Sequence, residues 1–389
     1  MNHHVAIDAF RLVGEPTSIG TYTIELAVAL AEEGCRITLL IPRQERGGML
    51  DALLAMLPGL RVLSPTRESQ PEESTWDLYR WNQCTIPALL KATDCDCLIS
   101  TYHQTPLRLP KRIPRVAVIH DCCGLREDCG YRFPGRAWLR HRVNLQSASL
   151  AAECIVPISL HTREDYLRIF PGAGNRLAAP IYNKVSSVTL APAVVSDELE
   201  LLNLPSHGYI LGFGLGGKRK GTEIAFKAYS LYRQNGGTLP LVLIGGKNLD
   251  LAAMGLNPAD PPKVLGRVND RTRDALYAGA ACLLFFSRCE GFGYPMVEAA
   301  RQGCPSVAWS KTTALEIFED TIPLMQHLSS REGADLIRHY AALPADQRSI
   351  LGHRLISRSE AFRNKQFGRD FVRAIETAVR RTKNLNAHH

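Results

Sequence analysis

The chain has 389 residues, of which 45% are hydrophobic and 22% charged, and its formal net charge is +8. This length exceeds one ordinary hydrophobic core and predicts two domains of fewer than about 200 residues each. No apolar run approaches the roughly 20 residues of a membrane-spanning helix, and the opening MNHHVAIDAF lacks the order of a secretory signal, so the composition excludes an integral membrane protein and favours a cytoplasmic one.

The strands expected in the first half alternate with helices. Residues 5–8 and 36–41 are predicted strands, and residues 19–33 between them form a helix that Gly34 ends. This order opens a parallel, doubly wound α/β sheet, whose ligands bind at the carboxyl ends of the strands. The loop that ends at Gly20 is therefore expected to face the ligand, although an ordinary strand-to-helix loop is the alternative.

Two further strands are expected at residues 97–101 and 115–119, after a helix over residues 76–91. The acidic run Asp94-Cys95-Asp96 invites a metal interpretation, but it precedes a strand instead of ending one, so no metal is expected there. His120 follows a strand directly, which favours a place at the ligand-binding edge. A purely structural histidine is the alternative.

The eleven cysteines are scattered, and several, such as Cys282 and Cys304, stand in apolar contexts typical of strands. This pattern predicts reduced thiols in a cytosol and no disulfides. Five cysteines lie closer together: Cys95, Cys97, Cys122, Cys123 and Cys129. No pair among them has C-x-x-C spacing, so a zinc site is not favoured.

Positive charge concentrates in residues 105–142 and 354–383, each with nine basic and three acidic side chains. Such faces suit an anionic membrane surface or a phosphate-bearing acceptor, and a solvated helix face is the alternative. No nucleic-acid-binding motif accompanies the charge, so nucleic acid is not an expected partner.

Glycine and proline punctuate residues 171–207, which are expected to join the two halves. The second half repeats the strand and helix alternation, with strands at 209–213, 239–244 and 263–267 and helices at 223–234 and 272–280. Its first strand leads into a G-x-G-x-x-G match formed by Gly212, Gly214 and Gly217. A dinucleotide site also needs an acid at the end of the second strand, where this chain has Gly245.

Three cations follow those glycines, Lys218, Arg219 and Lys220, and they suit a diphosphate. The missing acid and this cationic run disfavour an NAD site. An NAD-dependent oxidoreductase that uses Gly212, Gly214 and Gly217 remains an alternative.

The most informative stretch is SRCEGFGYPMVEAARQG, residues 287–303, which follows a buried strand predicted at residues 281–286. Pro295 suits the first helical position, and Gly303 suits the residue after the helix. The start of this helix can bind an anion such as a pyrophosphate, because Gly291 and Gly293 let the backbone approach it. The acids Glu290 and Glu298 flank that anion site and suit the hydroxyls on either side of a nucleotide sugar's pyrophosphate.

The run CEGFGYPMVEAARQGCPSVAWS resembles the E-x7-E signature of the retaining GT-B glycosyltransferases, in particular glycosyltransferase family 4. The opening IDAFRLVGEPTSIG resembles the mannosyltransferases of that family. The resemblance implies two Rossmann-like, doubly wound domains that face each other across a cleft. Residues 1–190 would bind the acceptor, residues 191–360 the nucleotide sugar, and residues 361–389 would form a helix that crosses back to the first domain.

The resemblance also implies roles for single residues. Glu290 and His120 would meet the donor sugar, Glu298 the ribose, and the backbone at Val268 the base, while Gly20 would lie between the donor phosphate and the acceptor. The diphosphate would be bound by cations and by the backbone of the glycine-rich turn: Arg219, Lys220, Gly291, Phe292, Gly293 and Tyr294. One departure is that many members have an arginine directly after the strand glycine, whereas this chain has Phe213 or Leu215.

The expected activity is therefore a retaining hexosyl transfer, with no metal and no cofactor, to a saccharide or lipid-linked acceptor at the inner membrane surface. GDP-mannose is the preferred donor and a UDP-sugar the alternative. A non-catalytic sugar-binding protein on the same fold is a further alternative, and the oligomeric state is open.

Overall fold

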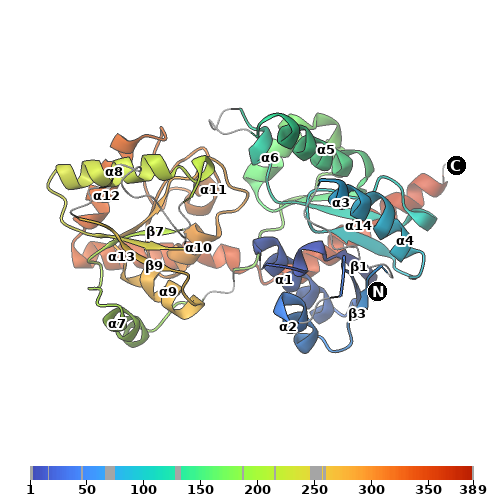
Figure 1. Cartoon of the computed structure of the whole chain (residues 1–389), viewed down its shortest axis with the longest axis horizontal. Coiled ribbons are helices and arrows are strands. Elements are labelled where there is room, and N and C mark those ends of the chain that lie inside the picture. The colour runs from blue at the N-terminus through green and yellow to red at the C-terminus, as the bar shows by residue number, and fades with distance from the viewer. Residues whose placement is uncertain are drawn as a thin grey trace. The chain divides into compact units, whose positions relative to one another are not determined.

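The computed structural model describes residues 3–15, 17–44, 47–65, 75–127, 133–185, 188–213, 216–245, 256 and 260–387. The chain divides into two compact units (Figure 1). Unit 1 consists of Met1–Arg126, Arg132–Lys184 and Lys365–His389, and unit 2 of Glu127–Tyr131 and Val185–Asn364.

Unit 1 is built on a six-stranded parallel sheet with the order β3-β2-β1-β4-β5-β6. Its strands are β1 (His4–Asp8), β2 (Arg36–Leu40), β3 (Arg61–Leu63), β4 (Cys97–Ser100), β5 (Arg115–Ile119) and β6 (Cys154–Pro157). The strands are buried except for the edge strand β3 and the first residues of β2 and β5, because helices cover both faces of the sheet. The strand order reverses between β1 and β4, so the ligand edge of a doubly wound sheet lies at their carboxyl ends.

The α-helices of unit 1 are α1 (Ser18–Glu32), α2 (Gly48–Met56), α3 (Thr75–Arg80), α4 (Ile86–Leu90), α5 (Gly135–Ala151), α6 (Leu160–Ile169) and α14 (Phe367–Ala387). Short 3-10 turns are η1 (Phe10–Leu12), η3 (Pro110–Arg112), η4 (Cys123–Leu125) and η5 (Pro171–Arg176). The helix expected over residues 76–91 exists, but it is interrupted by a π-helical turn, η2 (Trp81–Thr85). Pro87 follows this turn; it has no N–H and crowds the carbonyl four residues back, so the turn ahead of it widens.

The helix α14 completes unit 1 although it comes from the far end of the chain (Figure 1). The ring of Tyr22 in α1 lies edge-on to Phe367 and Phe371, with centroids 5.8 and 6.5 Å away. A Cβ at Gly368 would come within 2.6 Å of the Ala29 carbonyl oxygen, so this glycine lets α14 approach α1 closely. Residues of α1 and α14 thus share one apolar interface.

Unit 2 contains a five-stranded parallel sheet with the order β11-β10-β7-β8-β9. Its strands are β7 (Ile210–Phe213), β8 (Leu241–Ile244), β9 (Lys263–Gly266), β10 (Cys282–Phe285) and β11 (Ser306–Ala308). Its helices are α7 (Pro192–Leu201), α8 (Thr222–Gln234), α9 (Asp270–Gly279), α10 (Tyr294–Arg301), α11 (Ala314–Phe318), α12 (Ser330–Ala341) and α13 (Ala345–Ser359), with 3-10 turns η6 (Lys218–Lys220) and η7 (Glu360–Arg363). The order reverses between β7 and β10, at whose carboxyl ends ligands of such a sheet bind.

The segment expected as an irregular joint, residues 171–207, contains the regular helix α7. Its Pro192 occupies the first turn, where proline is favoured. Leu199 is buried, and Glu198 accepts hydrogen bonds from Arg271 and Thr272 of α9 at 2.8 and 2.9 Å. Pro192 therefore marks the start of a helix, and not part of an irregular linker as expected.

Among the described residues, eight cysteines carry free thiols, and seven of these are buried: Cys35, Cys95, Cys97, Cys122, Cys154, Cys282 and Cys304. Cys123 is disulfide-bonded, so the expectation of reduced thiols is wrong for this residue. Spacing along the chain does not show which thiols meet in a fold. Across the residues described above, no helix is long and apolar enough to cross a membrane.

Candidate functional site

Two loops meet at the carboxyl edge of the unit 2 sheet, one after β7 and one after β10. The amide of Arg288 donates to the Arg219 carbonyl oxygen at 2.8 Å, and the Ser287 hydroxyl oxygen lies 3.3 Å from the same oxygen. The guanidinium of Arg288 also donates to Lys218 O and to Glu223, at 3.1 and 2.8 Å. The cationic turn η6 and the E-x7-E segment are therefore held together by hydrogen bonds.

Gly221 permits this junction. It has a φ of +62° and immediately precedes α8, and a Cβ there would lie 2.1 Å from the Phe286 carbonyl oxygen. Any side chain would separate η6 from the loop after β10. The glycine that follows the Lys-Arg-Lys run is thus required by the close approach of the two loops.

Glu290 lies at the centre of the cluster, with its side chain 12% exposed. Its Oε1 accepts from Lys220 Nζ and from the Ser287 hydroxyl, both at 2.6 Å, and Arg219 Nη1 is 3.3 Å away. Burial by itself raises the pKa of this carboxyl, but the two cations and the hydrogen bonds hold the pKa below its ordinary value. Glu290 is therefore an ionised carboxylate in a fixed orientation.

The two cations extend toward solvent more than Glu290 does, with Arg219 34% and Lys220 28% exposed. Arg219 also donates to the Cys289 carbonyl oxygen at 3.0 Å, and the Lys220 ammonium lies 5.8 Å from the centre of the Phe285 ring. Two positive charges thus meet one negative charge. The remaining positive charge at the sheet edge suits a diphosphate.

The helix α10 begins beside this cluster. It starts at Tyr294, so Pro295 is its second residue and not the first as expected, and its cap is Gly293 with a φ of +89°. A Cβ at Gly293 would lie 2.5 Å from the Met296 methyl and 3.2 Å from the Thr313 hydroxyl. Gly303 has a φ of +75° just after the helix, as expected. The positive dipole end of α10 lies at Tyr294, four residues after Glu290, which favours an anion there.

Glu298 lies one turn into α10 and has different partners. Tyr277 donates its hydroxyl proton to Glu298 Oε2 at 3.4 Å, and Arg273 Nε is 3.6 Å from the same oxygen. Burial raises the pKa of Glu298 despite the nearby Arg273 cation. Sequence reasoning missed Tyr277 and Arg273, which both lie on α9; their i, i+4 spacing was the available signal.

Three other residues predicted at this edge of the unit 2 sheet, Gly291, Phe292 and Val268, differ in burial. Gly291 and Phe292 are buried, and the Phe292 ring packs against Tyr294 and Phe362 with centroids 5.1 and 5.9 Å away. The Phe292 side chain thus belongs to the core, which leaves its backbone as the part a ligand can meet. Val268 lies half-buried in the loop between β9 and α9.

In unit 1, His120 follows β5 and is half-buried. Its Nε2 lies 2.7 Å from the Thr101 carbonyl oxygen, which can only accept, so this nitrogen carries the proton and Nδ1 is an acceptor. The ring lies edge-on to Tyr22 at 4.9 Å. Burial lowers the pKa of His120, so the imidazole is neutral near pH 7.

Gly20 lies in the first turn of α1, and its amide donates to the Thr17 hydroxyl at 3.0 Å. A Cβ there would lie 2.7 Å from the Arg11 carbonyl oxygen and 2.8 Å from Met49 Sδ. Close packing within unit 1 is thus sufficient to explain this glycine.

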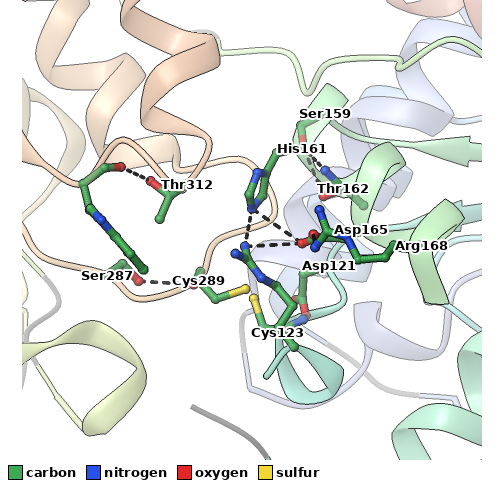
Figure 2. A network of polar contacts seen from close by, with 12 residues as sticks. Asp121, Cys123, Ser159, His161, Thr162, Asp165, Arg168, Ser287, Cys289 and Thr312 are labelled. Atoms are coloured by element: carbon green, nitrogen blue, oxygen red, sulfur yellow. Dashed lines mark hydrogen bonds and ion pairs between the residues drawn. The ribbon is translucent and has the colours of Figure 1, made fainter. Parts of the chain in front are cut away.

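A buried ionic network that the sequence analysis missed supports the same edge of unit 1 (Figure 2). Asp165 of α6 pairs with Arg126 at 3.4 Å and with Arg168 at 3.1 Å, and Arg126 also contacts His161. Both Asp165 and Arg126 are 3% exposed. Arg126 was counted only as part of a basic segment, because its acid lies on a later helix.

The start of α6 also fixes His120. The Ser159 hydroxyl accepts from the Thr162 amide at 3.0 Å, which caps α6 (Figure 2). The Thr162 hydroxyl donates to the His120 carbonyl oxygen at 3.3 Å. The Ser159 and Thr162 pair is thus a positioning device for the residue after β5.

Two other candidate sites were considered in the sequence, the acidic run before β4 and the dinucleotide match that begins in β7. Asp94 and Asp96 precede β4 and bind His4, with Asp94 Oδ1 2.9 Å from His4 Nδ1 and Asp96 Oδ2 accepting from the His4 amide at 2.8 Å. No cluster of three potential metal ligands is present in the portion of the chain whose placement is described. In the dinucleotide match, Gly214 lies outside the described residues, as does Leu215.

Residues 207–338 match the family model for glycosyl transferases group 1. The O-antigen chain mannosyltransferase B of Escherichia coli is 28% identical over 233 residues, which cover 56% of this chain and 59% of that protein. The chain therefore spans about three fifths of the length of that relative.

Several solved structures share the fold. HepE of Anabaena, in complex with UDP and glucose, has a TM-score of 0.71 and 17% identity over 97% of this chain and all of that one. Sucrose-phosphate synthase of Thermosynechococcus elongatus has a TM-score of 0.68 and 16% identity, with both chains fully covered. WaaG, a glycosyltransferase involved in lipopolysaccharide biosynthesis, has a TM-score of 0.68 and 12% identity over 96% of this chain and 98% of that one.

The two parallel sheets and these similarities lead to one conclusion. The chain has the GT-B glycosyltransferase fold, and its residues 207–338 match the family model for glycosyl transferases group 1.

Proposed function

We propose that the protein transfers a hexose from a nucleotide sugar to a saccharide or lipid-linked saccharide. The observation that carries this proposal is the cluster of Glu290, Lys220 and Arg219 beside the start of α10. It provides positive charge for a diphosphate and an ionised carboxylate for sugar hydroxyls within one rigid junction. The family match of residues 207–338 supports the same reaction class.

The parts of the donor are assigned as follows. Arg219, Lys220 and the start of α10 hold the diphosphate and stabilise the charge that develops on it as the glycosidic bond breaks. Glu290 accepts hydrogen bonds from hydroxyls of the donor sugar. Glu298, one turn further along α10, accepts hydrogen bonds from the ribose, and the backbone at Val268 faces the base.

Transfer is proposed to proceed with retention of configuration and without a metal. A covalent intermediate would need a carboxylate that is available to attack the anomeric carbon. Glu290, held by Lys220 and Ser287, is assigned here to the hydroxyls of the donor sugar and not to nucleophilic attack. The acceptor is therefore proposed to attack on the same face as the departing diphosphate. The cations of η6 fill the electrostatic role that a metal would otherwise have.

GDP-mannose is the preferred donor, and the mannosyltransferase relative supports it. A UDP-sugar is the second candidate, since the HepE structure of the same fold holds UDP and glucose. The strand-end edge of unit 1, which includes His120 and Gly20, is proposed to bind the acceptor, with His120 also meeting the donor sugar.

The test is thermal unfolding of the purified protein with GDP, UDP, ADP or NAD, each near millimolar. A ligand at about 100 times its dissociation constant adds roughly 2.7 kcal/mol to the unfolding free energy, which gives a clear shift. Stabilisation by GDP alone, followed by mannose transfer from GDP-mannose with the anomeric configuration retained, is the expected result. Stabilisation by NAD alone would refute the proposal.

A further inference from the structure

A cavity of about 920 Å³ lies within unit 2, and none of the described residues that line it belongs to the candidate site. One face of α7 and one face of α13 form its sides, since the lining residues recur every three or four positions, from Pro192 to Glu200 on α7 and from Ala345 to Ile356 on α13. Small-molecule sites typically have volumes of about 300–1,000 Å³. The space between the two helices is therefore large enough for a ligand.

This cavity is at the amino edge of the unit 2 sheet, whereas the candidate site is at the carboxyl edge. Its lining includes His207, three residues before β7, and Gly303, three residues before β11. Lys220 and Glu290 instead follow the carboxyl ends of β7 and β10. A ligand in the cavity would thus not occupy the edge that is proposed to bind the donor.

The walls of the cavity are fixed by contacts within unit 2. The Gln302 side chain, at the end of α10, accepts from the Leu190 amide at 3.1 Å and donates to the Val188 carbonyl oxygen at 2.9 Å. A Cβ at Gly303 would lie 3.1 Å from the Gly352 Cα, so these two glycines let α13 approach the end of α10 closely. A ligand would therefore meet preformed walls, which lowers the ordering cost of binding.

Arg348 of α13 brings a positive charge to the cavity without a paired acid. Its guanidinium donates to the carbonyl oxygens of Tyr340 and Leu343 at 3.5 and 2.9 Å, and no carboxylate of the described residues forms an ion pair with it. Burial lowers the pKa of Arg348, because its charged form is partly desolvated. A guanidinium binds a carboxylate or a phosphate through parallel hydrogen bonds, so an anion in the cavity would supply the missing counter-charge.

The rest of the lining favours an aliphatic body for the ligand. Val195, Leu199, Leu204 and Ile356 supply branched aliphatic surface, and the described residues that line the cavity include no Phe, Tyr or Trp. Nucleotide bases characteristically stack on aromatic side chains, so this lining disfavours a nucleotide. Glu200 also lines the cavity, but it is exposed, and solvent ions screen its repulsion of an anion.

We propose that this cavity binds a small organic anion that carries a carboxylate or phosphate head on a short aliphatic chain. The head pairs with Arg348, and the chain lies along the aliphatic sides of α7 and α13. Ser349 and His353, which lie on the same face of α13 and line the cavity, supply further hydrogen-bond donors to the head. The inference goes beyond glycosyl transfer and is independent of it, because binding is measured without donor or acceptor.

The first experiment is isothermal titration calorimetry with n-octyl phosphate and with n-octanoate, both below their micelle concentrations. Binding of either anion at a single site supports the proposal, and the tighter of the two identifies the preferred head. Octyl glucoside has the same chain without the charge, and inorganic phosphate has a charge without the chain. Each of these controls should bind at least about tenfold more weakly, because one loses the charge-assisted hydrogen bonds and the other the apolar burial.

Two variants locate the site. Ser349→Trp should abolish binding, because the indole fills the space between the helices, and Arg348→Gln should weaken binding of the anion by at least about tenfold without changing the affinity for octyl glucoside. Ile350→Trp and Arg354→Gln are the matched controls on α13, since neither residue lines the cavity, and both should bind like the wild type. Circular dichroism and thermal unfolding check the fold. Because Arg348 also bonds the end of α12, Ser349→Trp provides a test that keeps this contact.

Other results would overturn the proposal. Equal affinity for octyl phosphate and octyl glucoside would show that Arg348 recognises no anion, and unchanged binding in both Ser349→Trp and Arg348→Gln would place the ligand elsewhere. Displacement of octyl phosphate by GDP would assign it to the cations of η6. No saturable binding near millimolar ligand would exclude the site. Nucleotide-induced thermal shifts are measured separately, so failure of this site and failure of the proposed function are distinguishable.

Discussion

Lys220 Nζ lies 2.6 Å from Glu290 Oε1, although 70 residues separate the two in sequence. The pair joins the turn after β7 to the loop after β10, and Glu290 is the more buried partner. Removing Lys220 and removing Glu290 are therefore expected to lower the unfolding free energy by different amounts. A buried carboxylate without its cation costs more than a half-exposed ammonium without its acid.

We expect Lys220→Ala to lower the unfolding free energy by about 1–3 kcal/mol, because Glu290 keeps only Arg219 as a cation. Glu290→Gln should cost less, since the amide oxygen still accepts from Ser287. Urea denaturation of both variants and of the double variant measures the coupling between the residues. A coupling energy of zero would show that the pair does not stabilise the fold.

Glu290→Ala should lower turnover by about tenfold or more, because a charge-assisted hydrogen bond to the sugar is worth about 1.5–3 kcal/mol. Affinity for the free nucleoside diphosphate should stay near the wild-type value, since it lacks the sugar. Glu223→Ala, which removes the acid paired with Arg288 at 2.8 Å, is the control. Unchanged turnover in Glu290→Ala would remove the residue from its assigned role.

Glu298→Gln should raise the melting temperature near pH 7 and weaken nucleotide binding by roughly tenfold. Because burial raises the pKa of Glu298 in the folded state, its ionised form costs stability above that pKa, and the cost disappears as pH falls through it. Arg273 keeps Asp270 and Asp274 as partners at 2.8 and 2.9 Å.

The difference in melting temperature between this variant and the wild type should therefore shrink as the pH falls toward 4.5, the ordinary value for glutamate. Scanning calorimetry across that range, with and without the nucleotide, measures both effects. Full nucleotide affinity in Glu298→Gln would refute the ribose assignment.

Gly221→Ala should destabilise unit 2 by at least about 2 kcal/mol, since the residue has a positive φ and its Cβ would overlap the Phe286 carbonyl. Gly217→Ala is the matched control, because Gly217 also has a positive φ, +73°, but nothing lies within 4 Å of its Cβ position. It should cost only about 1 kcal/mol. Chemical denaturation of both variants separates steric overlap from backbone strain, and equal costs would contradict the close approach of the loops.

Asp8, at the end of β1, should make stability depend on pH. Burial raises its pKa from 3.8 to about 6, although Trp81 Nε1 donates to it at 2.8 Å. The folded state then binds the proton more tightly than the unfolded state, so this contribution falls as pH rises from about 4 to 6, by up to about 3 kcal/mol. Asp8→Asn keeps an acceptor for Trp81 and should flatten the profile. An unchanged profile in urea titrations would exclude Asp8 as its source.

The sheets were largely predictable because their strands are short apolar runs followed by glycine or polar residues. All strands predicted from residues 5–8 to 281–286 exist within about two residues of the expected bounds. The strand β11 and the helix α11 were not assigned because they have only 3 and 5 residues, and α12 and α13 were not assigned because charged residues interrupt their apolar positions. Proline misled the interpretation at α7, where it begins a helix.

The sequence indicated the site's acids and cations but not their pairing. Glu290 and Lys220 were named separately, and only the fold brings them to 2.6 Å. Ser287 and the α9 residues Tyr277 and Arg273 were missed, since their role depends on burial and on partners distant in sequence. The assignments of His120, Gly20 and Val268 to the donor or acceptor stay predictions.

Completion of unit 1 by α14 constrains the order in which the protein forms during synthesis. Residues 185–364 leave the ribosome before Phe367 and Phe371, so unit 2 has its entire sequence available first. Tyr22 and the rest of the α1 interface must wait with their apolar surface uncovered until α14 is made. Unit 1, whose strands are translated first, is thus the last to complete its fold. A nascent chain stalled before residue 367 would expose the apolar face of α1 to chaperones.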